Sequence, residues 1–189
     1  MFLKALFAVL LLLTSVSATA KPHRFAERQE GASKIQLTPA ANEDELCVTV
    51  MRGGAVVGAP IQISTCFDDS DPYAHLQRFT CSEEDQGGFL SIALECDPNL
   101  CIDRGSDDSD DGSGLQLQEC TGGTTSAQNW KHVDQQIFSY FDGTQKCLDV
   151  QEGSEHYQGA GEPYASEKSL QTWPCFEGNT NQMWKLSQA

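Results

Sequence analysis

The chain has 189 residues and a formal net charge of −15 at pH 7 with histidine neutral, and eight of its residues are cysteine. This length allows one domain with a single hydrophobic core and leaves no room for a second, catalytic domain. The acidic balance would repel a polyanion, and no basic stripe interleaved with aromatic residues occurs, so we expect no nucleic-acid partner.

The first twenty residues have the pattern of a signal peptide. Lys4 is followed by an apolar stretch from Leu6 to Leu13 and by the small-x-small end Ala18-Thr19-Ala20. The apolar stretch is too short to cross a bilayer, and no later stretch is apolar enough to do so. The sequence therefore predicts a signal peptide over 1–20, a polar leader over 21–33 and one domain over 34–189. We expect a secreted, extracellular protein without membrane insertion.

The predicted domain is an internal repeat. Three times a cysteine in a short apolar run is followed by a second cysteine and then by a Gln-x-aromatic triplet. The triplets are Gln77-Arg78-Phe79, Gln128-Asn129-Trp130 and Gln182-Met183-Trp184. Units that cannot each bury a hydrophobic face alone must pool their apolar residues at a common centre. The repeat predicts a closed threefold body with units at about 34–80, 88–132 and 135–187.

Each unit is predicted to hold four strands. A leading strand at 34–37, 89–94 or 136–141 passes through a polar turn into the cysteine-containing strand, which is the pattern of a β-hairpin. A third strand at 60–63, 115–118 or 170–173 precedes the second cysteine, and the fourth is expected to hold the triplet. Twelve strands without an amphipathic helix between them predict an all-β domain.

The cysteines indicate disulfides rather than a zinc site, because a secretory leader implies an oxidising compartment and no Cys-x-x-Cys pair occurs. If the repeat holds, one bridge lies in each unit and the two remaining cysteines pair across the first junction. The expected pairs are Cys47 with Cys66, Cys101 with Cys120, Cys147 with Cys175, and Cys81 with Cys96.

The third unit resembles a known family. The segments Cys147-Leu148-Asp149-Val150, Leu170-Gln171-Thr172-Trp173-Pro174-Cys175 and Asn181-Gln182-Met183-Trp184 are similar to the sugar-binding subdomain of ricin B-type lectins. The likeness extends over about 35–186 and is weaker in the first unit, where Phe79 replaces a tryptophan. It implies a β-trefoil, in which a six-stranded barrel is capped by three hairpins. Phe79, Trp130 and Trp184 would then belong to the core.

The resemblance also implies a carbohydrate site in the third unit. A neutral sugar needs hydrogen-bonding partners for its hydroxyls and a flat ring for its C–H face. Asp149 would accept hydrogen bonds from two adjacent hydroxyls, Trp173 would stack on the sugar, and Asn181 would contact a hydroxyl beside the carboxylate. Gln182 would orient these groups, and Gln171 would be a secondary contact. The structural alternatives are a turn anchored by Asp149, ordinary packing of Trp173, and a scaffold role for Gln182.

The other two units lack parts of this set. The second unit keeps Asp103 and Gln128, but Gln118 takes the place of Trp173 and Ala127 that of Asn181. The first unit has Thr49 at the aspartate position and Leu76 before Gln77. We expect one intact site and two degenerate ones, although an aromatic ring from elsewhere could complete the second.

Two loops have less specific patterns. The stretch from Glu152 to Tyr164 would extend the pocket through Tyr157 or Tyr164, or is a tolerated surface insertion. The segment 107–112 has the spacing of the start of a calcium loop, but Gln118 stands where a bidentate glutamate is required, which favours a solvated acidic turn. We expect no metal and no other cofactor.

The sequence favours a binding protein over an enzyme. The four histidines are scattered, no catalytic motif occurs, and every cysteine has an expected partner, so no catalytic residue is assigned. The hypothesis is a secreted lectin for glycans with terminal galactose or N-acetylgalactosamine, with millimolar affinity for one monosaccharide. The alternatives are a trefoil protease inhibitor and a secreted interaction protein that binds no sugar. The oligomeric state is not assigned.

Overall fold

The computed structural model describes residues 31–38, 45–51, 54–106, 111–123, 125–141, 143–151 and 168–188. The predicted signal peptide and most of the predicted leader lie outside these residues. The twelve strands are β1 (Ser33–Leu37), β2 (Leu46–Val50), β3 (Ile61–Thr65), β4 (Phe79–Cys81), β5 (Ile92–Leu94), β6 (Leu100–Asp103), β7 (Gln116–Glu119), β8 (Lys131–Val133), β9 (Gln136–Phe141), β10 (Thr144–Val150), β11 (Lys168–Pro174) and β12 (Trp184–Gln188). Three short 3-10 turns are η1 (Ala74–Gln77), η2 (Ser126–Gln128) and η3 (Thr180–Gln182).

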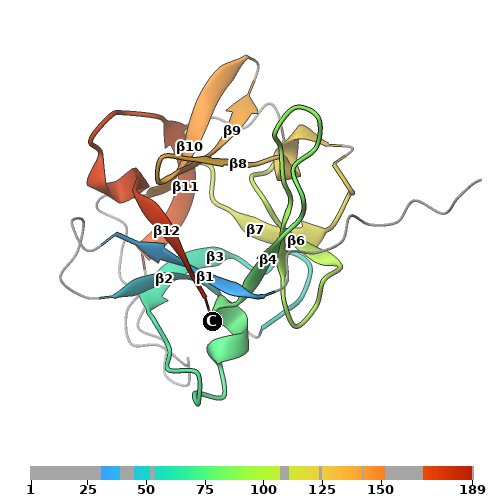
Figure 1. Ribbon diagram of the computed structural model, residues 1–189, viewed down its shortest axis with the longest axis vertical. Coiled ribbons are helices and arrows are strands. Elements are labelled where there is room, and N and C mark those ends of the chain that lie inside the picture. The colour runs from blue at the N-terminus through green and yellow to red at the C-terminus, as the bar shows by residue number, and fades with distance from the viewer. Residues whose placement is uncertain are drawn as a thin grey trace, which may run out of the picture.

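Six of the strands form a closed barrel. Strand β1 pairs with both β12 and β4, β4 pairs with β5, and β8 pairs with β9, all antiparallel. Leu90 and Trp130 exchange hydrogen bonds of 2.8 and 2.9 Å, which join the β5 side to β8. The Trp184 N–H donates to the carbonyl of Gln135 at 2.6 Å and joins β12 to the β8–β9 turn. Figure 1 shows the resulting arrangement of three groups of strands around a common centre.

The other six strands form three hairpins, one in each unit: β2–β3, β6–β7 and β10–β11. Turn chemistry helps to set the register of the strands. In the β9–β10 hairpin, Phe141 pairs with Thr144 and Gly143 has a φ of +77°, which suits a two-residue turn. The predicted β-trefoil of three four-stranded units is confirmed.

The core lies on the barrel axis and contains the aromatic residue of each triplet. Phe79, Trp130 and Trp184 are 1%, 0% and 0% exposed. The Trp130 indole N–H donates to the carbonyl of Ile102 at 3.1 Å, and that of Trp184 to the carbonyl of Leu148 at 2.9 Å. Buried tryptophans need such partners, and phenylalanine needs none, which explains how Phe79 fits at the same position. The prediction that these residues are core is confirmed.

The fourth strand of each unit begins later than predicted. Gln77, Gln128 and Gln182 each close a 3-10 turn, and the strand or bridge starts at the following aromatic residue. The turn allows the glutamine side chain to point inward to backbone groups of its own unit, as described below. Strand β5 is also shorter than predicted, because Leu90 forms only an isolated bridge and pairing resumes at Ile92.

Three of the four predicted disulfides form, namely Cys47–Cys66, Cys101–Cys120 and Cys147–Cys175, with Cα atoms 4.9, 5.0 and 5.1 Å apart. The prediction of a Cys81–Cys96 bridge is wrong, since both thiols are free. In the β4–β5 pairing, Cys81 lies opposite Ile92, four residues before Cys96. Four residues of extended chain span roughly 13 Å. A disulfide needs Cα atoms within about 7 Å, so this register keeps Cys81 and Cys96 too far apart to form one.

Candidate carbohydrate-binding site

In every unit, the triplet glutamine makes the same three hydrogen bonds. Its carbonyl oxygen accepts from the backbone N–H that follows the second half-cystine, at 2.7, 2.8 and 2.9 Å in the three units. Its amide donates to the carbonyl just before that half-cystine, at 3.0, 2.9 and 3.0 Å. The amide also donates to the side chain two residues after the first half-cystine, which is Thr49, Asp103 or Asp149. This network connects each hairpin to its 3-10 turn.

In the third unit, three amide groups surround a buried carboxylate. Asp149 is 4% exposed and lies on β10 opposite Gln171 of β11. The Gln171 amide donates to Asp149 Oδ1 at 2.7 Å, and that of Gln182 donates to Oδ2 at 2.9 Å. The Asn179 amide donates to Oδ2 at 3.4 Å. A buried carboxylate requires such donors, and together they fix its orientation.

Trp173 stands beside this cluster. It follows Gln171 by two residues on β11, and residues two apart in a strand point to the same face of the sheet. A Cβ built on Gly112 would lie 3.3 Å from Gln171 Oε1 and 3.6 Å from Trp173 Cζ3, so both side chains reach the same place. Trp173 is 38% exposed, whereas the other two tryptophans are fully buried. An indole at the surface next to a polar cluster can stack on a sugar.

The structure places the five predicted side chains unequally. Asp149, Gln171 and Gln182 form one hydrogen-bonded group, and Trp173 adjoins it through Gln171. The backbone N–H of Asn181 donates to Asn179 Oδ1 at 3.1 Å. The amide of Asn179, at the N-cap of η3, lies beside the carboxylate.

Sequence reasoning missed Asn179. The signal was present, since asparagine is favoured at the start of a turn, where its side chain accepts a nearby N–H. The predicted second platform at Tyr157 or Tyr164 lies outside the described residues, as do residues 107–110 of the acidic segment. Within the part of the chain that the structure describes, no group of histidine, cysteine or acidic side chains could hold a metal ion.

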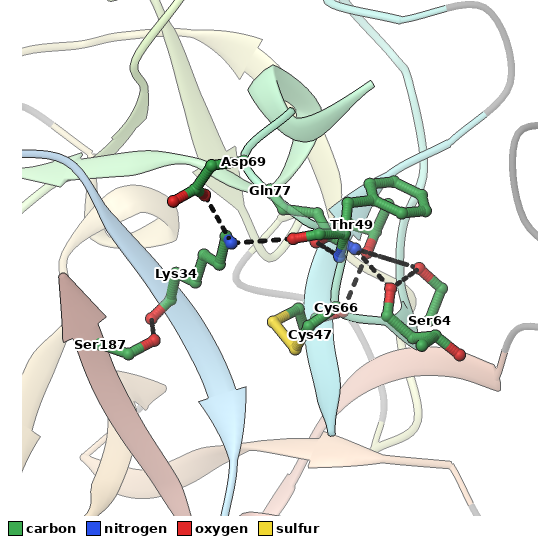
Figure 2. Close-up of a disulfide and its surroundings, with 10 residues drawn as sticks. Lys34, Cys47, Thr49, Ser64, Cys66, Asp69, Gln77 and Ser187 are labelled. Atoms are coloured by element: carbon green, nitrogen blue, oxygen red, sulfur yellow. Dashed lines mark hydrogen bonds and ion pairs between the residues drawn. A yellow bond between two sulfur atoms is a disulfide. The ribbon is translucent and has the colours of Figure 1, made fainter. Parts of the chain in front are cut away.

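The first unit has a sealed, uncharged version of the same cluster. Thr49, Ser64 and Gln77 are each 0% exposed. The Thr49 hydroxyl donates to the carbonyl of Cys47 at 2.9 Å and lies 2.8 Å from Ser64 Oγ. Figure 2 shows these side chains converging beside the Cys47–Cys66 disulfide. A ligand could reach none of them without displacing the hairpin.

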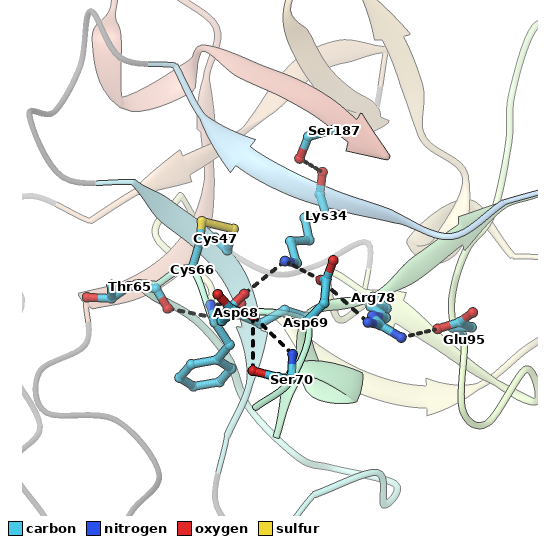
Figure 3. A network of polar contacts seen from close by, with 12 residues as sticks. Lys34, Cys47, Thr65, Cys66, Asp68, Asp69, Ser70, Arg78, Glu95 and Ser187 are labelled. Atoms are coloured by element: carbon cyan, nitrogen blue, oxygen red, sulfur yellow. Dashed lines mark hydrogen bonds and ion pairs between the residues drawn. A yellow bond between two sulfur atoms is a disulfide. The ribbon is translucent and has the colours of Figure 1, made fainter. Parts of the chain in front are cut away.

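A charged network covers the outer side of the first unit (Figure 3). Lys34 Nζ donates to Asp69 at 2.9 Å and to the carbonyl of Phe67 at 2.8 Å, while the N–H of Phe67 donates to Gln77. Arg78 approaches Asp69 at 3.4 Å and Glu95 at 4.0 Å. The hydrogen bond from Lys34 holds the pKa of the Asp69 carboxyl below its usual value. These ion pairs connect β1, the loop after β3 and β4.

The second unit combines a carboxylate with an open hollow. Asp103 is 8% exposed and accepts the N–H of Gly105 at 2.7 Å on Oδ1 and the Gln128 amide at 3.0 Å on Oδ2. A hollow of about 550 Å³ lies over these groups. Its walls are formed by Val57, Asp103, Gly105, Ser106, Gln116, Gln118, Glu119, Thr121, Thr125, Ala127 and Gln128. The lining includes the counterparts of all five predicted site residues, with Gln118 in the position of Trp173.

Comparison with solved structures places this architecture among β-trefoils. The designed threefold-symmetric protein ThreeFoil matches with a TM-score of 0.60 at 18% identity over 85% of this chain and 100% of that chain. The C-half of an earthworm R-type lectin, solved with GalNAc, matches with 0.56 at 15% over 84% and 99%. The lectin of Vibrio vulnificus hemolysin/cytolysin, solved with N-acetyl-D-lactosamine, matches with 0.56 at 18% over 84% and 94%. At these identities the likeness shows the fold.

A search of curated protein sequences finds no match. Among the described residues, no helix reaches the length and hydrophobicity that crossing a bilayer requires. The ricin-type beta-trefoil lectin domain matches residues 36–184, which include the ten strands from β2 to β11 whole and parts of β1 and β12. The chain therefore belongs to the family of ricin-type beta-trefoil lectin domains.

Proposed function

We propose that this protein is a secreted, non-catalytic lectin that binds glycans with terminal galactose or N-acetylgalactosamine through its third unit. The observation that carries the proposal is the pairing of a fixed carboxylate with a partly exposed indole. Asp149 is held by amides of Gln171 and Gln182, and Trp173 stands next to Gln171 at the surface. The first unit has neither group.

The chemistry of these sugars suits that arrangement. In galactose, the 3- and 4-hydroxyls are neighbours, so one carboxylate can accept a hydrogen bond from each. The axial 4-hydroxyl leaves the opposite face of the ring with a patch of C–H groups, which an indole can cover. The earthworm and Vibrio lectins were solved with N-acetylgalactosamine and N-acetyl-D-lactosamine, and both ligands contain a galactose-type ring, which supports this choice of sugar.

A second, weaker site in the second unit is favoured by the hollow over Asp103. Its volume of about 550 Å³ lies within the range of small-molecule pockets, roughly 300–1,000 Å³. Asp103 and Gln128 repeat the carboxylate and amide of the third unit. Val57, which is 53% exposed, is the largest apolar side chain in a lining that has no aromatic ring. A chain with two sites could cross-link glycans, which one site cannot do.

Two substitutions separate the sites. Trp173→Ala should remove the stronger binding phase and most of the retention on immobilised galactose while the melting temperature stays close to that of the wild type, because the indole is partly exposed. Asp103→Asn keeps the size of the side chain and should change retention only slightly, with loss of the weaker phase in a calorimetric titration.

Unchanged binding by the Trp173→Ala variant would refute the third-unit site. A stable complex with a protease that free galactose does not release would favour an inhibitor instead.

Secretion rests on residues 1–20 and needs its own test. The pattern of a charged start, an apolar centre and a small-x-small end predicts cleavage after Ala20. When the full chain is expressed in a secreting host, the protein in the medium should begin at or near Lys21 by N-terminal sequencing. Retention of the intact chain inside the cell would contradict this part of the proposal.

A further inference from the structure

A short piece of the second unit borders the third-unit site. Gly112 N donates to the carbonyl of Thr172 at 3.0 Å, and Thr172 N donates to the carbonyl of Ser113 at 3.2 Å. Gly114 forms a bridge with Gln171. These bonds lie on the edge of β11 that β10 leaves open. The strand that carries Gln171 and Trp173 is therefore flanked by its own unit on one side and by the second unit on the other.

Gly112 is the residue of this piece that touches the site. Its φ is +89°, a region that favours glycine. A Cβ at this position would meet Gln171 Oε1 at 3.3 Å and Trp173 Cζ3 at 3.6 Å. The first of these distances is tighter than an ordinary contact, so an added methyl group would push the amide, and through it the hydrogen bond to Asp149.

An ion pair fastens the same piece to the third unit. The carboxylate of Asp111 contacts the ammonium group of Lys146 on β10, and the two side chains are 39% and 17% exposed. Lys146 precedes Cys147, which lies opposite Trp173 in the pairing of β10 with β11. Asp111 and Gly112 are thus attached to both strands of the β10–β11 hairpin, one by charge and the other through the backbone.

The same construction recurs one unit earlier without the side-chain contact. Gly58 N donates to the carbonyl of Leu117 at 2.8 Å, Leu117 N donates to the carbonyl of Ala59 at 2.8 Å, and Pro60 forms a bridge with Gln116. Gly58 has a φ of +83°, but a Cβ there would meet no atom within 4 Å. Gly58 is therefore a matched control for Gly112, because its φ is similar and no atom lies within 4 Å of where its Cβ would be.

We propose that Gly112 is a positioning residue of the third-unit sugar site, and that this site is assembled from two consecutive units rather than from one. The inference rests on the proposed function of the third unit. Gly112 leaves room for Gln171 and Trp173 to lie side by side at the mouth of the site. The Asp111–Lys146 pair keeps this glycine in place.

The test compares Gly112→Ala with Gly58→Ala in the full chain. Both changes put a methyl group at a positive φ, so both should lower the melting temperature, Gly112→Ala by the larger amount because its Cβ also meets Gln171. Only Gly112→Ala should weaken the affinity for methyl galactoside, by about tenfold or more in a calorimetric titration. It should also change the acrylamide quenching of tryptophan fluorescence, which reports on Trp173 because the other two tryptophans are buried. Gly112→Asn is the substitute if the alanine variant does not fold, since asparagine tolerates positive φ best.

The results separate the two hypotheses. Equal affinities of the Gly112 and Gly58 variants for methyl galactoside, with unchanged quenching, would overturn the inference while the proposed function stands. If the wild-type chain itself ignored galactose, the proposed function would fail, and with it the sugar role of Gly112. The quenching comparison would then still decide whether Gly112 positions Trp173. Lower affinity together with altered quenching in the Gly112 variant alone supports the inference.

Discussion

The first and third units share a hydrogen-bonding frame and differ in the side chain that completes it. Gln77 and Gln182 each accept from the N–H after a half-cystine and donate to the carbonyl before it. The remaining amide hydrogen goes to the hydroxyl of Thr49 in the first unit and to the carboxylate of Asp149 in the third. A neutral hydroxyl therefore suffices to complete the frame.

The comparison separates the needs of folding from those of binding. A buried carboxylate is costly unless donors surround it, and the third unit supplies amides of Gln171, Asn179 and Gln182. The first unit avoids this cost and is closed to solvent around Thr49. Because the frame does not require a charge, the charge at Asp149 supports the role proposed for this residue in sugar recognition.

The largest expected effect comes from the core residue of the third unit. Trp184→Ala should lower the free energy of unfolding by about 3–5 kcal/mol, since it opens a cavity on the barrel axis and leaves the carbonyl of Leu148 without its donor. Trp184→Phe copies the first unit, where Phe79 fills this place, and should cost only about 1–3 kcal/mol. Urea unfolding monitored by far-UV circular dichroism measures both. Equal losses would show that the two units do not use this position alike.

The first unit also carries a thiol on β4 that has no counterpart in the third. Burial raises the pKa of Cys81 to about 11. The unfolded chain loses this proton near the ordinary thiol value of 9.0, whereas the folded chain keeps it, so stability should fall as the pH rises from about 9 to about 11. The loss attributable to Cys81 should reach roughly 3 kcal/mol, by the conversion of about 1.4 kcal/mol per pH unit.

Cys81→Ala is the control for this pH dependence. The difference in unfolding free energy between pH 8 and pH 11 should shrink in the variant relative to the wild type. Thiol titration of the native wild-type chain should also find the exposed Cys96 reactive at once and Cys81 only after unfolding. If neither thiol reacted after unfolding without a reductant, the two would be bridged, as the sequence predicted.

Exchanging the distinguishing residue tests the comparison itself. Asp149→Thr places the first unit's side chain in the third unit and should reduce galactose affinity at least tenfold, which is about 1.4 kcal/mol. The fold should survive, because Thr49 shows that threonine can accept the glutamine amide. Titration calorimetry and a melting curve on one sample measure both quantities. Retained affinity would mean that Asp149 belongs to the frame alone.

The repeat made most of the fold predictable. Two half-cystines and one Gln-x-aromatic triplet per unit predicted the hairpin and the core residue, because each motif residue bonds within its own unit. The 3-10 turn before each aromatic residue was not predicted. The resemblance to the lectin family named Gln171 as a secondary contact of the site, and the structure places it opposite Asp149. Contacts inside a unit are the part of the structure that a repeated sequence encodes most directly.

The missed features depend on contacts between units or on strand register. The pairing of Cys81 with Cys96 was assumed by elimination. In the β4–β5 register, however, Cys81 lies opposite Ile92, and Cys96 follows Ile92 by four residues. The hollow over Asp103 needs Val57 from the first unit, and the third-unit site meets Gly112 from the second. The residue pattern of one unit does not indicate which residues a neighbouring unit contributes to the lining of its site.

The smallest expected effect concerns the ion pairs that cover the first unit. Lys34→Met removes the partner that lowers the pKa of Asp69, so the variant should lose the stability that this carboxylate gives above its ordinary pKa. In the wild type this stability disappears as the pH falls through the lowered pKa. Because the Asp69 side chain is exposed to solvent, the loss should be slight and should vanish in 1 M salt, where charges are screened within about 3 Å. Melting curves of both chains at low and high salt measure it. A larger loss that persists in salt would mean that Lys34 acts mainly through its bond to the carbonyl of Phe67, and hence through the frame itself.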